Sequence, residues 1–140
     1  MRGLLLDTTV LIDVSRGFRP TVRWVERQPL TRLYLSSLTV GELVRGAYRR
    51  FAASPAVLTD ELHHMRTVLL PRFGGRVLSF DAEAAEIWGR LVGTGEARGT
   101  RPPTDDAKIA AIALLHGLTV ATSNQRDLAP LCPTIDPRAP

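Results

Sequence analysis

The stretch that decides the fold reads GLLLDTTVLIDV and covers residues 3–14. Residues 3–6 form an uninterrupted apolar run, which predicts a short strand buried in a parallel sheet. Apolar residues then recur at helical spacing from Val10, and Gly17 ends the predicted helix. Asp7 stands at the junction of the two. A buried strand that passes directly into a helix is typical of an α/β protein.

The same alternation continues along the chain. We predict further strands at residues 33–36, 76–80, 118–122 and 134–136. The predicted helices cover residues 20–28, 37 or 39 to 51, 54–69 (ended by Pro71), 81–92 and 104–116, and residues 93–103 form one long loop. The predicted fold class is α/β, a three-layer sandwich with a central, mostly parallel sheet flanked by helices. The 140 residues suit a single domain, 1–140, whose tail from about residue 131 is expected to fray.

The composition is that of an ordinary globular protein in a reducing compartment. Cys132 is the only cysteine, so no intrachain disulfide can form, and no apolar stretch is long enough to span a membrane. We therefore expect a cytoplasmic protein. Basic residues outnumber acidic ones by 18 to 14, and all of the basic ones except Lys108 are arginine. This excess suits contact with a polyanion, although an arginine-rich genome explains it equally well.

Three acidic residues lie within apolar sequence, where an ionised carboxylate is costly. Asp7 follows LLL, Glu42 lies in TVGEL, and Asp106 precedes AKIAA. A buried carboxylate destabilises a protein unless it is paired or binds a cation. Three such acids brought together would raise one another's pKa values, and Mg²⁺ or Mn²⁺ would neutralise them because these ions prefer oxygen ligands. The pattern predicts a metal-dependent nuclease.

Each acid also has an ordinary structural explanation. Asp7 could cap the helix that follows, a role that Thr8 or Thr9 could fill equally well. Glu42, which we place in the first turn of its helix, could favour the positive helix end or pair with Arg45. For Glu42, a metal site is favoured over these explanations only because Asp7 and Asp106 show the same pattern.

Helical spacing distinguishes Asp105 from Asp106. Steps of three, four and seven residues from Asp106 reach small apolar residues at 109, 110 and 113, whereas the step of three from Asp105 reaches Lys108. We predict that Asp106 points inward, and that Asp105 caps the helix or pairs with Lys108 at the surface.

The segment TSNQRDL, residues 122–128, follows the predicted fourth strand. Asn124 could bind metal or water through its amide oxygen, and Asp127 could supply a further carboxylate. A simple turn, with Asp127 capping the next segment, is an equal alternative. Elsewhere, Asp13 is expected to pair with Arg16 across one helical turn.

Together these motifs resemble the PIN-domain family, and within it the VapC-type toxins of bacterial toxin–antitoxin pairs. The matching segments are LDTTVLID at 6–13, SLTVGEL at 37–43, DAKIAA at 106–111 and HGLTVATSNQRDL at 116–128. One such segment is a weak signal, but four in order along the chain are specific. The resemblance implies a PIN-like fold and cleavage of RNA that depends on Mg²⁺ or Mn²⁺. It also implies a cognate antitoxin protein as inhibitor and a homodimer.

The resemblance implies roles for individual residues. Asp7, Glu42 and Asp106 match the family's three acids, and Asp7 and Asp106 would bind the metal. Asn124 and Asp127 would complete the catalytic set, although many members have an acid at the position of Asn124.

Supporting contacts follow from the same comparison and from charge. Thr9 would hold the first acid in place, and Arg98, Arg101 and Arg126 would hold the RNA backbone. Ser123 departs from the family, because many members have arginine there. Apolar stripes on the helices at 40–51 and 58–69 could form the dimer and antitoxin surfaces, but such stripes more often fill a core.

An alternative function is a catalytically silent module that binds RNA or a protein through the same acidic groove. A phosphatase with an aspartyl nucleophile fits less well, because such enzymes carry a second Asp two residues after the first, where this chain has Thr9. The variant Asp106→Asn separates a nuclease from a binding module, since a nuclease would lose cleavage while keeping its fold and RNA binding.

Overall fold

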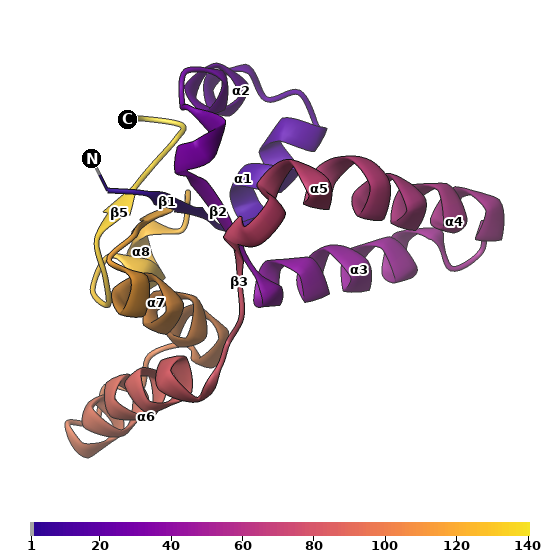
Figure 1. The fold of residues 1–140 in the computed structure, drawn as a ribbon. Coiled ribbons are helices and arrows are strands. Elements are labelled where there is room, and N and C mark those ends of the chain that lie inside the picture. The colour runs from indigo at the N-terminus through magenta and orange to yellow at the C-terminus, as the bar shows by residue number, and fades with distance from the viewer. Residues whose placement is uncertain (1) are drawn as a thin grey trace.

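The computed structural model describes residues 2–140 and contains a five-stranded sheet (Figure 1). Its strands are β1 (Leu4–Leu6), β2 (Leu33–Ser36), β3 (Val77–Leu78), β4 (Thr119–Ala121) and β5 (Thr134–Ile135). Their order is β3-β2-β1-β4-β5, and every neighbouring pair is parallel. The apolar run that opens the chain is therefore the central strand, with β2 on one side and β4 on the other.

Helices cover both faces of this sheet. They are α1 (Thr8–Ser15), α2 (Arg19–Glu26), α3 (Ser37–Phe51), α4 (Pro55–His64), α5 (Leu70–Phe73), α6 (Ala82–Ala97), α7 (Thr104–His116) and α8 (Gln125–Leu128). In Figure 1, α1 and α2 lie on one side of the sheet, α6 and α7 lie on the other, and α3 and α4 project as a long hairpin. The predicted three-layer α/β fold is confirmed.

Alternation along β1 divides the core between the two faces. Leu5 packs with buried residues of α6 and α7, whereas Leu4 and Leu6 pack with Val10 of α1 and Trp24 of α2. Burying each of these leucines stabilises the fold by roughly 1.5–3 kcal/mol. Because both faces of β1 are covered, its sequence is apolar throughout, and its end is held firmly in place.

The hairpin of α3 and α4 has a small core of its own. Ala47, Leu62 and Met65 are buried there, so the apolar stripes of the two helices pack largely on each other. Tyr48 remains 54% exposed on the outer face of α3. Among residues 2–140, no helix combines the length and apolar character that crossing a membrane requires.

Two helices run further than predicted. α6 continues to Ala97, so the loop expected at 93–103 shortens to residues 98–103, because glycine inside a helix costs only about 1 kcal/mol. The helix expected to end before Pro71 continues to Phe73. A turn of π-helix, Met65–Leu69, precedes Pro71 and shifts the hydrogen-bond ladder where proline lacks an N–H group.

The segment 131–140, which was expected to fray, is held against the domain. β5 pairs with β4, and Arg138 forms an ion pair with Asp13 of α1, with Nη2 2.7 Å from Oδ1. The predicted pairing of Asp13 with Arg16 is therefore wrong. The reason is burial. The Asp13 side chain is only 6% exposed and also accepts a hydrogen bond from Thr21 at 2.7 Å, whereas an ion pair with Arg16 on the same helix would require Asp13 to face solvent.

Candidate active site

The strand order gathers the predicted site residues at one edge of the sheet. In parallel sheets, ligands bind beyond the carboxyl ends of the strands, at the point where the connections turn in opposite directions. Here that point is β1, since the chain moves first to β2 and later to β4. Asp7 follows β1, Glu42 follows β2 on α3, and Asn124 follows β4.

Asp7 is buried and held by hydrogen bonds to both of its oxygens. Oδ1 accepts from the backbone N–H of Thr8 at 2.9 Å, so of the capping alternatives considered Asp7 itself caps α1, and Thr8 and Thr9 do not. Oδ2 accepts from the Thr122 hydroxyl at 2.8 Å and from the Thr9 hydroxyl at 3.3 Å. The expected support from Thr9 is present. These donors fix the orientation of a side chain that is only 6% exposed.

Glu42 reaches the site from α3. The hydroxyl of Ser36 caps this helix by accepting from the Thr39 N–H at 3.1 Å, so α3 begins directly at the end of β2. Glu42 therefore lies beyond the first turn, contrary to our placement. Its Oε2 accepts a hydrogen bond from the Thr8 hydroxyl, which ties α3 to α1. Within residues 2–140 the one ion pair is Arg138–Asp13, so the alternative pairing of Glu42 with Arg45 is absent.

Asp106 has the most perturbed carboxyl group of the site. Its pKa is raised to about 6, first by burial and then by the negative charges of Asp7, Asp127, Glu42 and Asp105. Each of these carboxylates is thus close enough to Asp106 to disfavour its ionised form. Acids that are far apart in sequence share one electrostatic environment, as the three-acid pattern predicted.

The first turn of α7 separates Asp105 from Asp106 as expected, with Asp105 exposed and Asp106 half-buried. The residue that precedes α7 is Pro103, so Asp105 does not cap it. Lys108 does not pair with Asp105 but lies over the rings of Phe80 and Trp88, 5.8 Å and 6.0 Å from their centroids. The ammonium of Lys108 thus makes cation–π contacts with two half-buried rings instead of the expected ion pair.

Thr122 joins the two halves of the site. It is fully buried, donates to Asp7, and accepts from the Asn124 backbone N–H at 2.9 Å. The amide Nδ2 of Asn124 faces Asp106 Oδ2 at 3.5 Å, at the limit of hydrogen bonding. Asp127 lies in the short helix α8 and contributes charge to Asp106. The capping role considered for Asp127 is not seen, since Asn124 precedes α8.

The carboxylates are near one another but are not closed around a common point. In the part of the chain that the structure describes, no three His, Cys, Asp or Glu side chains form a ready-made metal-binding group. The available donors are nevertheless all oxygen, namely several carboxylates and one amide, and Asp106 is destabilised as an anion. This donor set suits a hard divalent cation.

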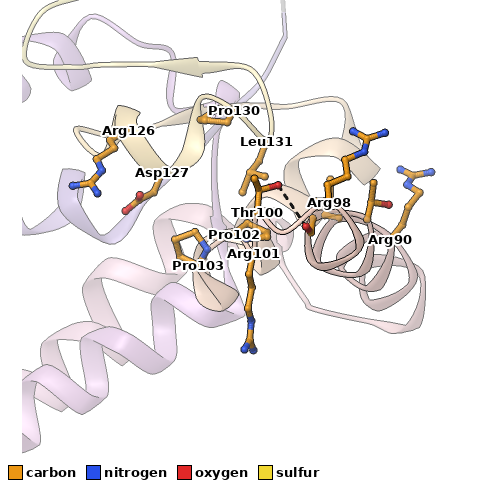
Figure 2. A pocket seen from close by; sticks show the side chains of 13 residues that line it. Arg90, Arg98, Thr100, Arg101, Pro102, Pro103, Arg126, Asp127, Pro130 and Leu131 are labelled. Atoms are coloured by element: carbon orange, nitrogen blue, oxygen red, sulfur yellow. Dashed lines mark hydrogen bonds between the residues drawn. The ribbon is translucent and has the colours of Figure 1, made fainter.

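Sequence reasoning missed the hydroxyl groups that support the acids. Thr122 and Thr8 were not assigned to the site, and Ser36 was assigned only to a strand. Their position directly after buried strands was the available signal. The three arginines that we predicted to contact RNA line one cavity together with Asp127 (Figure 2). They are Arg98, Arg101 and Arg126.

Comparison with known proteins agrees with the fold and shows the family. The family model described as PIN domain matches residues 4–130. The chain is 40% identical over 132 residues to the plasmid stability protein StbB of Pseudomonas syringae pv. tomato, covering 91% of this chain and 89% of that protein. It is 34% identical over 131 residues to the VapC ribonuclease Y4jK of Sinorhizobium fredii, with the same two coverages. It is 36% identical over 125 residues to the toxin FitB of Neisseria gonorrhoeae, covering 85% and 86%.

A solved structure shows the same architecture. The crystal structure of FitAcB from Neisseria gonorrhoeae superimposes with a TM-score of 0.87 and 29% identity, covering 96% of this chain and 97% of that one. The resemblance inferred from four short motifs therefore extends over nearly the whole fold. The chain belongs to the PIN-domain family and groups with its VapC-type ribonucleases.

Proposed function

We propose that this protein is a metal-dependent ribonuclease, the toxin of a toxin–antitoxin pair. The observation that carries the proposal is the arrangement of Asp7, Glu42 and Asp106 at the switch point of the sheet, where hydrogen bonds from Thr122, Thr8 and Asn124 hold them. The raised pKa of Asp106 agrees with this arrangement. The VapC ribonuclease and the FitB toxin among its relatives support the same activity.

The residues fit a Mg²⁺ ion, or Mn²⁺ in its place. Asp7 and Asp106 would hold the cation, since hydrogen bonds from Thr122 and Thr9 fix the orientation of the Asp7 carboxyl group and Asp106 gains most from a neighbouring positive charge. When bound, the cation would lower the pKa of a water molecule and offset charge on the phosphoryl oxygens.

The chain's own groups would position and deprotonate the attacking water. Glu42 is a suitable acceptor for its proton, because the Thr8 hydroxyl orients one carboxylate oxygen and leaves the other free. Asn124 and Asp127 would supply further oxygen atoms to the metal site, beside the reacting phosphate. Thr122 keeps Asp7 and the Asn124 backbone in register.

We infer a cognate antitoxin and a homodimer as partners. The structural relative is the FitAcB assembly, whose fold this chain shares over 96% of its length. The exposed outer face of the α3–α4 hairpin, including Tyr48, is available for such contacts. RNA as substrate and an antitoxin as inhibitor place the protein in the cytoplasm.

The first experiment is cleavage of total cellular RNA by purified protein with Mg²⁺, Mn²⁺ or EDTA. We expect discrete fragments that depend on metal and disappear in Asp7→Ala and Asp106→Asn. Thr119→Val, on β4 but away from the acids, is the control and should cleave normally. Binding of RNA without cleavage under any metal, by folded protein free of antitoxin, would instead support the silent binding module.

A further inference from the structure

A cavity beside the acidic site is rich in arginine. It has a volume of about 610 Å³ and lies between α6, the loop 98–103 and α8. Arg90, Arg98, Arg101 and Arg126 line it, and we name it the arginine groove. We propose that this groove binds the phosphodiester backbone of a single-stranded part of the RNA substrate, next to the phosphate that is cleaved. This inference rests on the proposed ribonuclease function.

The arginine groove opens onto the catalytic acids. Asp127 lines one end of it and also contributes to the raised pKa of Asp106. Figure 2 shows Arg126 beside Asp127 at that end, Arg90 and Arg98 at the other, and Arg101 between them. A strand whose scissile phosphate lies at the acids would therefore continue directly along the arginines.

The charges of the groove are free to bind an external anion. All four arginines are exposed, and Asp127 is the one acidic residue in the lining. Among residues 2–140, the ion pair is Arg138–Asp13, and none of the four guanidinium groups takes part in a side-chain hydrogen bond or lies over an aromatic ring. Exposed guanidinium groups without partners favour phosphate, which a guanidinium binds through two parallel hydrogen bonds.

The spacing favours a chain of phosphates over a single anion. Arg90 and Arg98 are eight residues apart along α6, which corresponds to about 12 Å. Arg126 lies at the opposite end of the groove from these two residues (Figure 2), so the arginines form a row along the groove and not a cluster around one anion. No aromatic side chain lines the cavity, so contacts to the backbone would outweigh stacking of bases.

The loop that carries Arg98 and Arg101 is fixed against α6. The Thr100 N–H donates to the Gly95 carbonyl at 2.8 Å, and a Cβ at Gly95 would lie only 2.4 Å from the Thr100 oxygen. Glycine is therefore required for this close approach. A loop held in this way positions its arginines before the substrate arrives, which reduces the entropy lost on binding.

The test compares two double variants that lose the same charge. Arg90→Ala/Arg98→Ala removes one end of the groove, and Arg23→Ala/Arg27→Ala removes two exposed arginines at α2, on the other side of the sheet (Figure 1). Binding of a fluorescent single-stranded RNA of 12 nucleotides is measured in EDTA, which prevents metal-dependent cleavage. The groove variant should bind about tenfold more weakly at low salt, and the slope of log Kd against log salt should fall by about 1.4. The α2 variant should bind like the parent protein.

Equal losses in the two variants, or no loss in the groove variant, would overturn the inference. So would stronger binding of poly-glutamate than of RNA with the same dependence on Arg90 and Arg98, because the groove would then recognise an acidic protein segment. The nuclease proposal is judged separately by cleavage with Mn²⁺. Parent protein that cleaves nothing but binds RNA through the groove refutes the nuclease alone, whereas cleavage that does not depend on the groove arginines refutes the groove alone.

Discussion

Lowering the pH from 7 to 5 should weaken the binding of a divalent metal by about tenfold, because Asp106 takes up a proton in this range. With a pKa of about 6, its carboxyl group is about one-tenth protonated at pH 7 and about nine-tenths protonated at pH 5. Only the carboxylate binds metal. The apparent Kd should therefore rise from about 1.1 to about 11 times the value of the fully ionised site.

The assay is a calorimetric titration with Mn²⁺ at pH 5, 6 and 7. Asp106→Asn should bind metal weakly, and its apparent Kd should no longer change near pH 6. Asp105→Asn keeps every proposed ligand but removes one of the charges that raise the pKa of Asp106, so it should shift the step to lower pH. Constant affinity from pH 5 to 7, or an unchanged step in Asp106→Asn, would refute the assignment.

The same group predicts how the stability of the metal-free protein changes with pH. The pKa of Asp106 is higher in the folded chain than its ordinary value of 3.8, so the folded state binds the proton more tightly than the unfolded state does. Stability should therefore fall as the pH rises from about 4 to about 6, relative to Asp106→Asn. Added Mn²⁺ should restore it at pH 7.

Three further substitutions test other contacts. Thr122→Val leaves an Asp7 oxygen without its shortest side-chain donor, and should cost about 1–3 kcal/mol in urea unfolding and weaken Mn²⁺ binding. Arg138→Ala should lower the unfolding midpoint at pH 7, but this difference should shrink below about pH 4, because the low pKa of Asp13 stabilises only while that carboxyl is ionised. Gly95→Ala should cost about 1–3 kcal/mol and weaken RNA binding although every arginine is kept.

The threonine and glycine substitutions each have a matched control. For Thr122→Val, Thr119→Val makes the same change on β4, just before Thr122, at a site without a side-chain hydrogen bond among the described residues, and should leave metal binding unchanged. Gly93→Ala adds a methyl group to α6 where nothing lies within 4 Å, and should be neutral or stabilising by up to about 1 kcal/mol. If Gly95→Ala and Gly93→Ala had the same stability and the same RNA affinity, the inference that the loop packs closely on α6 at Gly95 would be wrong.

The positions of the acids could be predicted because apolar runs define where the strands end. Leu4–Leu6 reads as a buried strand, and a parallel sheet brings residues such as Asp7 and Asn124 to one edge. The inward direction of Asp106 followed from helical spacing alone. Local sequence patterns were thus sufficient to predict the fold class and to select the proposed catalytic residues.

Contacts between distant segments could not be predicted in the same way. Asp13 looked like the partner of a neighbouring arginine, because nothing near it shows that Arg138 lies across α1. The support that Thr122 gives Asp7 depends on the pairing of β1 with β4, which no local pattern encodes. Helix ends were also misplaced where packing outweighs propensity, as at Gly93 in α6.

The central position of β1 also affects synthesis of the protein. Asp7 leaves the ribosome early, yet Thr122, which holds it, lies 115 residues later. A growing chain that has not yet made β4 contains Asp7 and Glu42 without Asn124 or Asp127. The proposed catalytic set is therefore complete only after nearly the whole domain has emerged from the ribosome that translates it.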